Sequence, residues 1–128
     1  AQEATMRTIR VIFVPAGGLD PEQQPEVREV EDDLHTLQRL VAGPGQDKGW
    51  LECLGLDEGI DCYMNEEGRL IGLSPNRLVD RSDGAQFDIN GDFFLAGSND
   101  QGDIVSLSPD LEADWLQRMK EAPVAIFM

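Results

Sequence analysis

Residues 8–14 read TIRVIFV and are followed by PAGG at residues 15–18. A run of β-branched and aromatic side chains is typical of a β-strand, and Pro and Gly directly after it end the strand. Residues 19–25 contain two prolines and two glutamines and should form a loop. Glu26 to Val30 then returns as a short second strand, which we expect to pair with the first.

Two helices are predicted, one on each side of a strand-rich middle. Asp32 or Asp33 can cap the first helix, which Gly43-Pro44-Gly45 ends. Its apolar side chains have helical spacing, at Leu34, Leu37, Leu40 and Val41. The second helix opens at Ser108-Pro109-Asp110, with Ser108 as its cap. Its apolar face consists of Leu111, Trp115 and Met119.

The middle of the chain is predicted to be a β meander. Its short apolar segments are residues 50–54, 60–65, 69–71, 86–89 and 93–96, followed by a last short strand at 104–107. Turn chemistry at Asn65–Gly68 should link two antiparallel strands, and residues 124–128 are either an edge strand or a tail. The sequence therefore predicts one α+β domain over residues 1–128, with residues 1–6 loosely held. It should consist of a curved, mainly antiparallel sheet of about six or seven strands and two packed helices.

The composition is strongly acidic, with 25 Asp and Glu against 10 Lys and Arg and a net charge of -15. Binding to nucleic acid relies on basic side chains that displace counterions from the phosphates, so we expect no direct contact with DNA or RNA. Anionic lipid is repelled in the same way, and no apolar run approaches the roughly 20 residues needed to cross a bilayer. The N-terminus also lacks a signal pattern, and we expect a cytoplasmic protein without membrane association.

Catalytic and metal-binding chemistry has little support in the sequence. The single histidine, His35, falls on the outer side of the first predicted helix, without a nucleophile motif. Cys53 and Cys62 lack a C-x-x-C spacing, so we expect small buried hydrophobic residues rather than a disulfide or a metal pair. Oxygen-rich stretches at 88–92 and 99–103 do not fit a calcium loop and are interpreted as turns. We expect no cofactor, no metal and no enzymatic activity, with an enzyme of unknown type as a weaker alternative.

Residues 65–77, NEEGRLIGLSPNR, are more distinctive than a turn requires. They resemble the signature N-E-E-G-K-L-x-G-L-P-x-N-R of uncharacterised domains carried by bacteriophages, plasmids and their actinobacterial and firmicute hosts. Flanking segments are also similar, including FDINGDFF at 87–94, and the resemblance covers about residues 7–118. Here Ser74 precedes the proline, which departs from the signature. The resemblance implies an accessory protein of a mobile element, and proteins of that kind often bind a host component such as a defence system.

The signature loop is the first candidate site. Asn76 and Arg77 bring an amide and a guanidinium to the end of a strand, where they could hold an anionic or nucleotide-like ligand. Alternatively, Arg77 pairs with one of the many carboxylates and fixes the loop. The candidate residues for a ligand or partner are Asn65, Glu66, Gly68, Gly72, Asn76 and Arg77.

An acidic stretch before the first helix is the second candidate site. It consists of Asp20, Glu22, Glu26, Glu29, Glu31, Asp32 and Asp33. A face of this kind can imitate DNA phosphates and occupy the basic groove of a nuclease or repressor, but it can equally be a solubilising or salt-adapted surface. The leading hypothesis is a non-enzymatic protein of a mobile element that binds and modulates a host protein with a basic surface. The alternative is a small-molecule or nucleotide binder that uses Asn76 and Arg77.

Overall fold

The structure is a computed structural model that describes residues 7–17, 20–81, 83–123 and 125–127. The expectation for residues 1–6 therefore lies outside the described residues. The strands are β1 (Thr8–Val14), β2 (Glu26–Glu31), β3 (Leu51–Asp57), β4 (Ile60–Asn65), β5 (Pro75–Asp80), β6 (Gln86–Asn90), β7 (Phe93–Ser98), β8 (Ile104–Val105) and β9 (Ala125–Phe127). The helices are α1 (Leu34–Leu40) and α2 (Pro109–Glu121). The predicted α+β class is confirmed, with the strands divided between two sheets.

The larger sheet has the strand order β2-β1-β7-β4-β3, with β8 paired to β7, and all its pairings are antiparallel. Strand β1 pairs with β2 from Thr8 opposite Glu31 to Phe13 opposite Glu26, so the predicted pairing of these two strands is confirmed. Buried side chains lie on both faces of β1, because Val11 and Ile12 belong to different hydrophobic clusters. Both faces of the sheet are therefore covered.

The smaller sheet has the order β6-β5-β9, in which β6 is antiparallel and β9 parallel to β5. This sheet corrects one prediction, because residues 69–71 form a turn and the strand after Asn65 begins only at Pro75. Positive φ at Gly72 turns the chain there. The tail predicted as an edge strand or a free end is an edge strand at Ala125–Phe127.

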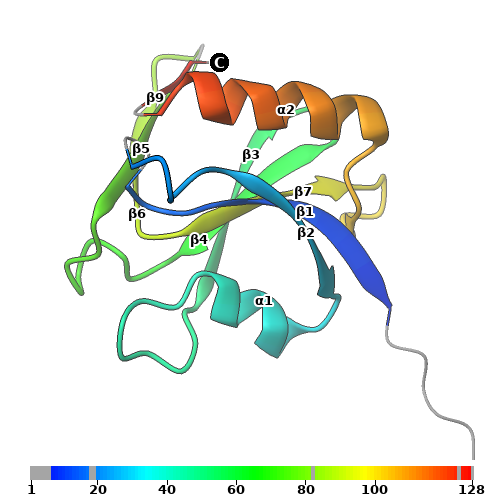
Figure 1. The fold of residues 1–128 in the computed structure, drawn as a ribbon. Coiled ribbons are helices and arrows are strands. Elements are labelled where there is room, and N and C mark those ends of the chain that lie inside the picture. The colour runs from blue at the N-terminus through cyan, green and yellow to red at the C-terminus, as the bar shows by residue number, and fades with distance from the viewer. Residues whose placement is uncertain (1–6, 18–19, 82, 124, 128) are drawn as a thin grey trace, which may run out of the picture.

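The two helices cover opposite faces of the larger sheet, with α2 above it and α1 below it in Figure 1. On the α2 side, Trp115 and Met119 pack into the larger of the two hydrophobic clusters, and on the α1 side Leu37 packs with Phe94. Both predicted caps are present: Asp33 accepts from Thr36 N at 3.0 Å and Ser108 from Leu111 N at 3.3 Å. No helix in the described part of the chain is long and apolar enough to cross a membrane.

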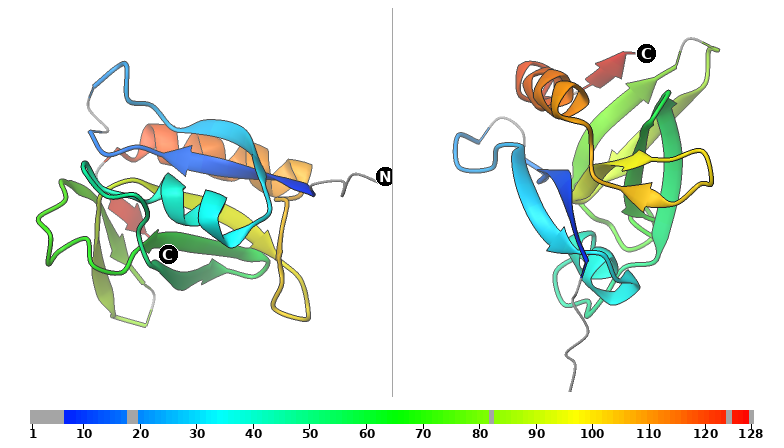
Figure 2. Two further views of the ribbon diagram at one scale, coloured as in Figure 1. Left: turned by 90° about the horizontal axis from the view of Figure 1, so that it is seen from below. Right: turned by 90° about the vertical axis from the view of Figure 1, so that its right-hand side faces the viewer.

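The smaller sheet stands beside the larger one and packs against it through the α2 side (Figure 2). Val79 of β5 and Ile89 of β6 are buried in the same cluster as Trp115. Strand β3 ends the larger sheet and β6 ends the smaller one, so neither has a second neighbouring strand among the described residues. These two free edges border the site described next.

Candidate functional site

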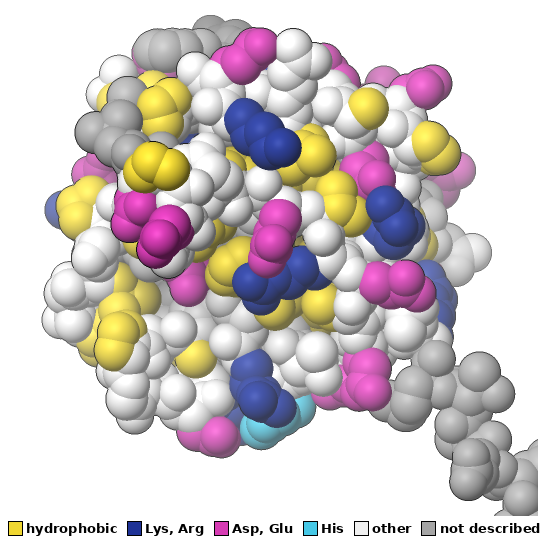
Figure 3. All heavy atoms as spheres, in the orientation of Figure 1, with side chains coloured by type: hydrophobic (Ala, Val, Ile, Leu, Met, Phe, Trp, Pro, Cys, Tyr) yellow, Lys and Arg dark blue, Asp and Glu magenta, His cyan; other side chains and the backbone are white. Residues whose placement is uncertain are grey.

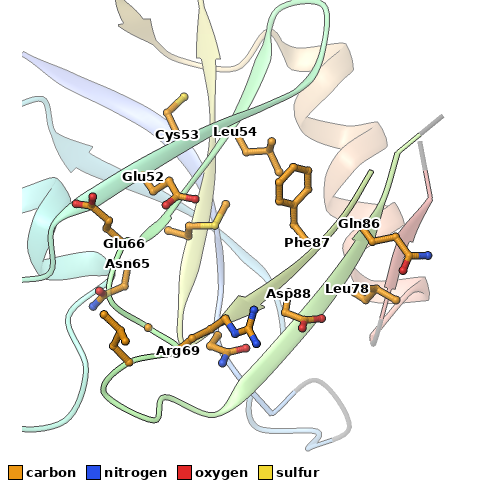
Figure 4. A pocket seen from close by; sticks show the side chains of 14 residues that line it. Glu52, Cys53, Leu54, Asn65, Glu66, Arg69, Leu78, Gln86, Phe87 and Asp88 are labelled. Atoms are coloured by element: carbon orange, nitrogen blue, oxygen red, sulfur yellow. The ribbon is translucent and has the colours of Figure 1, made fainter. Parts of the chain in front are cut away.

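A groove of about 720 Å³ lies between the free edge of β3 and the free edge of β6. Figure 4 shows Glu52 and Leu54 of β3 on one wall and Phe87 and Asp88 of β6 on the other. The connection from β4 to β5 forms one end of the groove and contributes Arg69. The volume of this groove is within the range found for ligand-binding clefts, about 300–1,000 Å³.

The groove contains more negative than positive charge. Glu52, Glu66 and Asp88 line it together with one guanidinium, that of Arg69. Among the described residues, none of these four side chains has a hydrogen bond or an ion pair within the protein. Their charges are therefore available to a molecule that enters the groove.

The closed end of the groove is built by two residues of the predicted signature, Asn65 and Gly68. Asn65 is buried, and its Nδ2 donates to Val41 O at 3.0 Å and to Gln46 Oε1 at 2.9 Å. A Cβ added to Gly68 would lie 2.7 Å from Asn90 O, so only glycine allows the β4–β5 connection to approach β6 this closely. Both residues hold the frame of the groove, and Glu66 is the acidic residue of the signature that lines it.

Asn76 and Arg77, the centre of the predicted ligand loop, are turned into the protein. Asn76 is 7% exposed, and its Nδ2 donates to Val14 O at 3.0 Å and to Gly91 O at 2.8 Å. Its Oδ1 accepts from the Arg77 guanidinium at 2.7 Å. This amide therefore ties together β1, β5 and the β6–β7 turn, and Asn76 presents no polar group to an external ligand.

Arg77 is 3% exposed and binds backbone and amide oxygens instead of a carboxylate. One of its terminal nitrogens donates to Met119 O at 3.1 Å, in the last turn of α2. The carbonyl end of a helix carries partial negative charge and stabilises a cation placed there. Burial lowers the pKa of Arg77, and its Nε has no hydrogen-bond partner. The alternative, in which Arg77 pairs with a carboxylate, is therefore wrong, because Asn76 and the end of α2 supply the acceptors.

The predicted acidic face does not form one continuous surface in the structure. Alternation along β2 places Glu26 on the same side as Val30, which packs toward α1. Glu29 and Glu31 lie on the side of Val27, which packs toward α2. The carboxylates of β2 are thus divided between the two faces of the sheet edge.

Several of these carboxylates have partners within the protein. The pairs are Asp32 with Arg7 at 3.3 Å, Glu26 with Arg28 at 2.6 Å, Glu29 with the Thr8 hydroxyl at 2.9 Å, and Asp33 with Thr36. Asp20 and Glu22 lie in the preceding loop, where Asp20 accepts from Glu22 N at 2.9 Å. In the view of Figure 3, Lys and Arg side chains lie between the Asp and Glu side chains. Two of the seven carboxylates of this stretch, Glu26 and Asp32, are therefore paired with a basic side chain.

The remaining chemical groups are dispersed. His35 is exposed on α1, and Cys62 is buried in the core. Cys53 is exposed, so the prediction that both cysteines are buried is wrong for this residue, which lies on an edge strand. Burial raises the pKa of the Cys62 thiol strongly, and partial desolvation of the Cys53 thiol raises its pKa as well. Among the described residues, no group of three or more His, Cys, Asp or Glu side chains could hold a metal ion.

Sequence reasoning missed most of the groove. Glu52, Arg69, Phe87 and Asp88 lie in three separate segments, and a single sequence does not show that β3 and β6 face each other. One local feature of the sequence could have indicated an exposed strand here, namely the aromatic residue Phe87 between the polar residues Gln86 and Asp88 on a predicted strand. Its neighbours mark the strand as partly solvated, as expected for an edge.

The sequence was compared with protein families, curated proteins and solved structures. It matches a family described as a domain of unknown function (DUF3846) over residues 18–120. No curated protein and no solved structure matches the chain. The match includes α1, all but the last residue of α2, strands β2 to β8 and every residue that lines the groove. The chain therefore belongs to this family of domains of unknown function.

Proposed function

We propose that this domain is a non-enzymatic binding protein that uses the groove between β3 and β6 to bind a protein partner with a basic surface. The observation that carries the proposal is the set of unpaired carboxylates in the groove, Glu52, Glu66 and Asp88. The resemblance of the signature to domains of mobile elements supports a host protein as the partner. Modulation of that protein would follow from occupation of its basic surface.

Exposed apolar side chains support the same surface. Five large hydrophobic residues are exposed in the described part of the chain, and four of them lie in segments that border the groove. Trp50 immediately precedes β3, Leu70 and Ile71 lie in the β4–β5 connection, and Phe87 is on β6. Apolar groups beside unpaired charges are typical of protein-binding surfaces, whose buried centres are rich in aromatic residues.

The distribution of charge along the chain also favours this side. Residues 47–103 contain 13 of the 25 acidic residues but only 4 of the 10 basic ones, so they carry nine of the fifteen excess negative charges. Of these four basic residues, Arg77 is buried and Arg81 pairs with Asp83 at 3.4 Å. The field around the groove should attract a basic protein and accelerate its association.

Co-purification from the host followed by mass spectrometry would identify the partner, and kinetic binding measurements would then test the groove. We expect the variant Glu52→Gln/Glu66→Gln/Asp88→Asn to associate about tenfold more slowly at low ionic strength. The difference should shrink between about 0.01 M and 0.15 M salt, as the Debye length falls from about 30 Å to about 8 Å.

Two triple variants with the same change in net charge serve as controls. Glu22→Gln/Glu29→Gln/Glu31→Gln neutralises the stretch around β2, and Glu58→Gln/Asp100→Asn/Asp114→Asn neutralises exposed positions in two turns and in α2. The proposal predicts that both bind the partner nearly as fast as the unchanged protein. Loss of binding in the β2 variant alone would show that the carboxylates around β2 bind the partner, and it would contradict the proposal.

A further inference from the structure

The free edge of β3 presents unpaired backbone groups to the groove. Glu66 N donates to Trp50 O at 2.7 Å, which makes Trp50 and Glu66 a hydrogen-bonded pair of the antiparallel ladder. Such pairs alternate along a strand, so the N–H and C=O groups of Leu51, Cys53 and Gly55 point away from β4. No other strand pairs with this edge among the described residues.

The opposite wall has the same property. Arg81 N donates to Ala85 O at 2.9 Å, which fixes the alternation in the β5–β6 ladder. The backbone groups of Gln86 and Asp88 therefore point away from β5, toward the open side. The groove lies between two strand edges that both have free hydrogen-bonding groups, which is the arrangement that accepts an additional strand.

The side chains of the groove determine what kind of strand would fit. Phe87 is 39% exposed and Leu54 is half-buried, and both point into the groove in Figure 4. Successive side chains of an extended segment point to opposite sides, so one set would cover these apolar groups and the other would be solvated at the rim. The three carboxylates and one guanidinium give the groove a net charge of about -2, which is complementary to a segment with basic side chains. Asp88 lies on the opposite face of β6 from Phe87, so basic residues that alternate with the apolar ones would meet Asp88.

We propose that the groove binds an extended segment of the protein partner, which adds to β3 as a further strand and alternates apolar with basic residues. This inference rests on the proposed function and specifies how the partner is held. Strand β3 has seven residues, so the paired segment would be at most about 23 Å long at roughly 3.3 Å per residue. Backbone hydrogen bonds would supply affinity, and the alternating side chains would supply selectivity.

The test uses two capped synthetic peptides of identical composition, one alternating as VRVRVRV and the other blocked as VVRRRVV. Binding to the unchanged protein is measured by calorimetry, and amide hydrogen exchange is followed by NMR. We expect the alternating peptide to bind at least tenfold more tightly than the blocked one. It should also slow exchange of the outward amides of Leu51, Cys53 and Gly55, while electrostatic contact of side chains alone would leave them unchanged.

A pair of substitutions at Cys53 provides a second measurement. Proline at this position removes an outward N–H that has no partner in the β3–β4 ladder, whereas Cys53→Ala retains it. We expect Cys53→Pro to weaken binding of the alternating peptide at least tenfold and Cys53→Ala to leave it within about twofold. Circular dichroism checks that the proline variant is folded, and the exchange measurement on the unchanged protein does not depend on it.

Equal binding of the two peptides, or unprotected β3 amides at saturation, would overturn strand addition. The proposed function is tested separately, by the effect of neutralising the groove on binding of the complete host partner. A partner that depends on the groove carboxylates but leaves the β3 amides unprotected would retain the function and refute this mode of binding. If binding of the partner is insensitive to the groove carboxylates while the alternating peptide still binds to β3, the proposed function is refuted and strand addition to β3 is retained.

Discussion

Replacing Asn76 with alanine should destabilise the protein strongly, because its amide joins three parts of the chain. The substitution removes two hydrogen bonds to backbone carbonyls, those of Val14 and Gly91, and one from the Arg77 guanidinium. A neutral hydrogen bond contributes about 1 kcal/mol and one to a charged group about 1.5–3 kcal/mol. The sum is about 4 kcal/mol, a large part of the roughly 5–15 kcal/mol that stabilises a typical domain.

Urea denaturation monitored by circular dichroism measures this loss as a lower midpoint at an unchanged slope. Asn99→Ala is a matched control, because Asn99 also makes three side-chain hydrogen bonds, but on the exposed turn before β8. Water can replace those bonds, so we expect a loss of about 1 kcal/mol or less. Equal losses in the two variants, or a loss below about 1 kcal/mol for Asn76→Ala, would refute the assignment of Asn76 to the framework.

Three further predictions concern stability and reactivity. Hydrogen bonds from Arg10 lower the pKa of Glu112 below its ordinary 4.5, so the carboxylate stabilises the fold above that pH. The stability advantage over Glu112→Gln should therefore decrease as pH falls below 4.5 and be lost as pH falls through the lowered pKa of Glu112. A thiol reagent should label Cys53 in the native protein and Cys62 only after unfolding, and two equivalents labelled natively would contradict the buried position of Cys62. Gly68→Ala should cost about 1–3 kcal/mol in urea, because its Cβ would meet a backbone oxygen at the end of β6.

The elements predicted best are those whose signals are local. Strand β1 was recognised from seven consecutive residues, and α2 from a cap, a proline in the first turn and one apolar face. Both caps hydrogen-bond within their own first turn, so their chemistry does not depend on the rest of the fold. Sequence reasoning is sufficient where the stabilising contact is close in the chain.

The missed strand β5 shows the limit of that reasoning. Leu70 and Ile71 were interpreted as a strand because they are apolar, yet they are exposed in a turn between Gly68 and Gly72. The real strand begins with Pro75 and then buries two polar residues, which removes the apolar alternation that marks a strand. The amide of Asn76 and one terminal nitrogen of Arg77 find acceptors in β1 and α2, distant in sequence, and no local pattern reveals such partners.

The difference between contacts that are local and contacts that are distant in sequence also explains why Asn76 and Arg77 were predicted to bind a ligand. An amide followed by a guanidinium can bind an anion, but the same donors also suit free carbonyl oxygens at strand and helix ends. Three such oxygens, from Val14, Gly91 and Met119, meet at this point in the fold. The side chains of Asn76 and Arg77 hydrogen-bond to these elements and are not available to a partner. A partner would therefore have to contact polar groups that have no hydrogen bond within the protein. Those groups are the groove carboxylates and the outward backbone of β3.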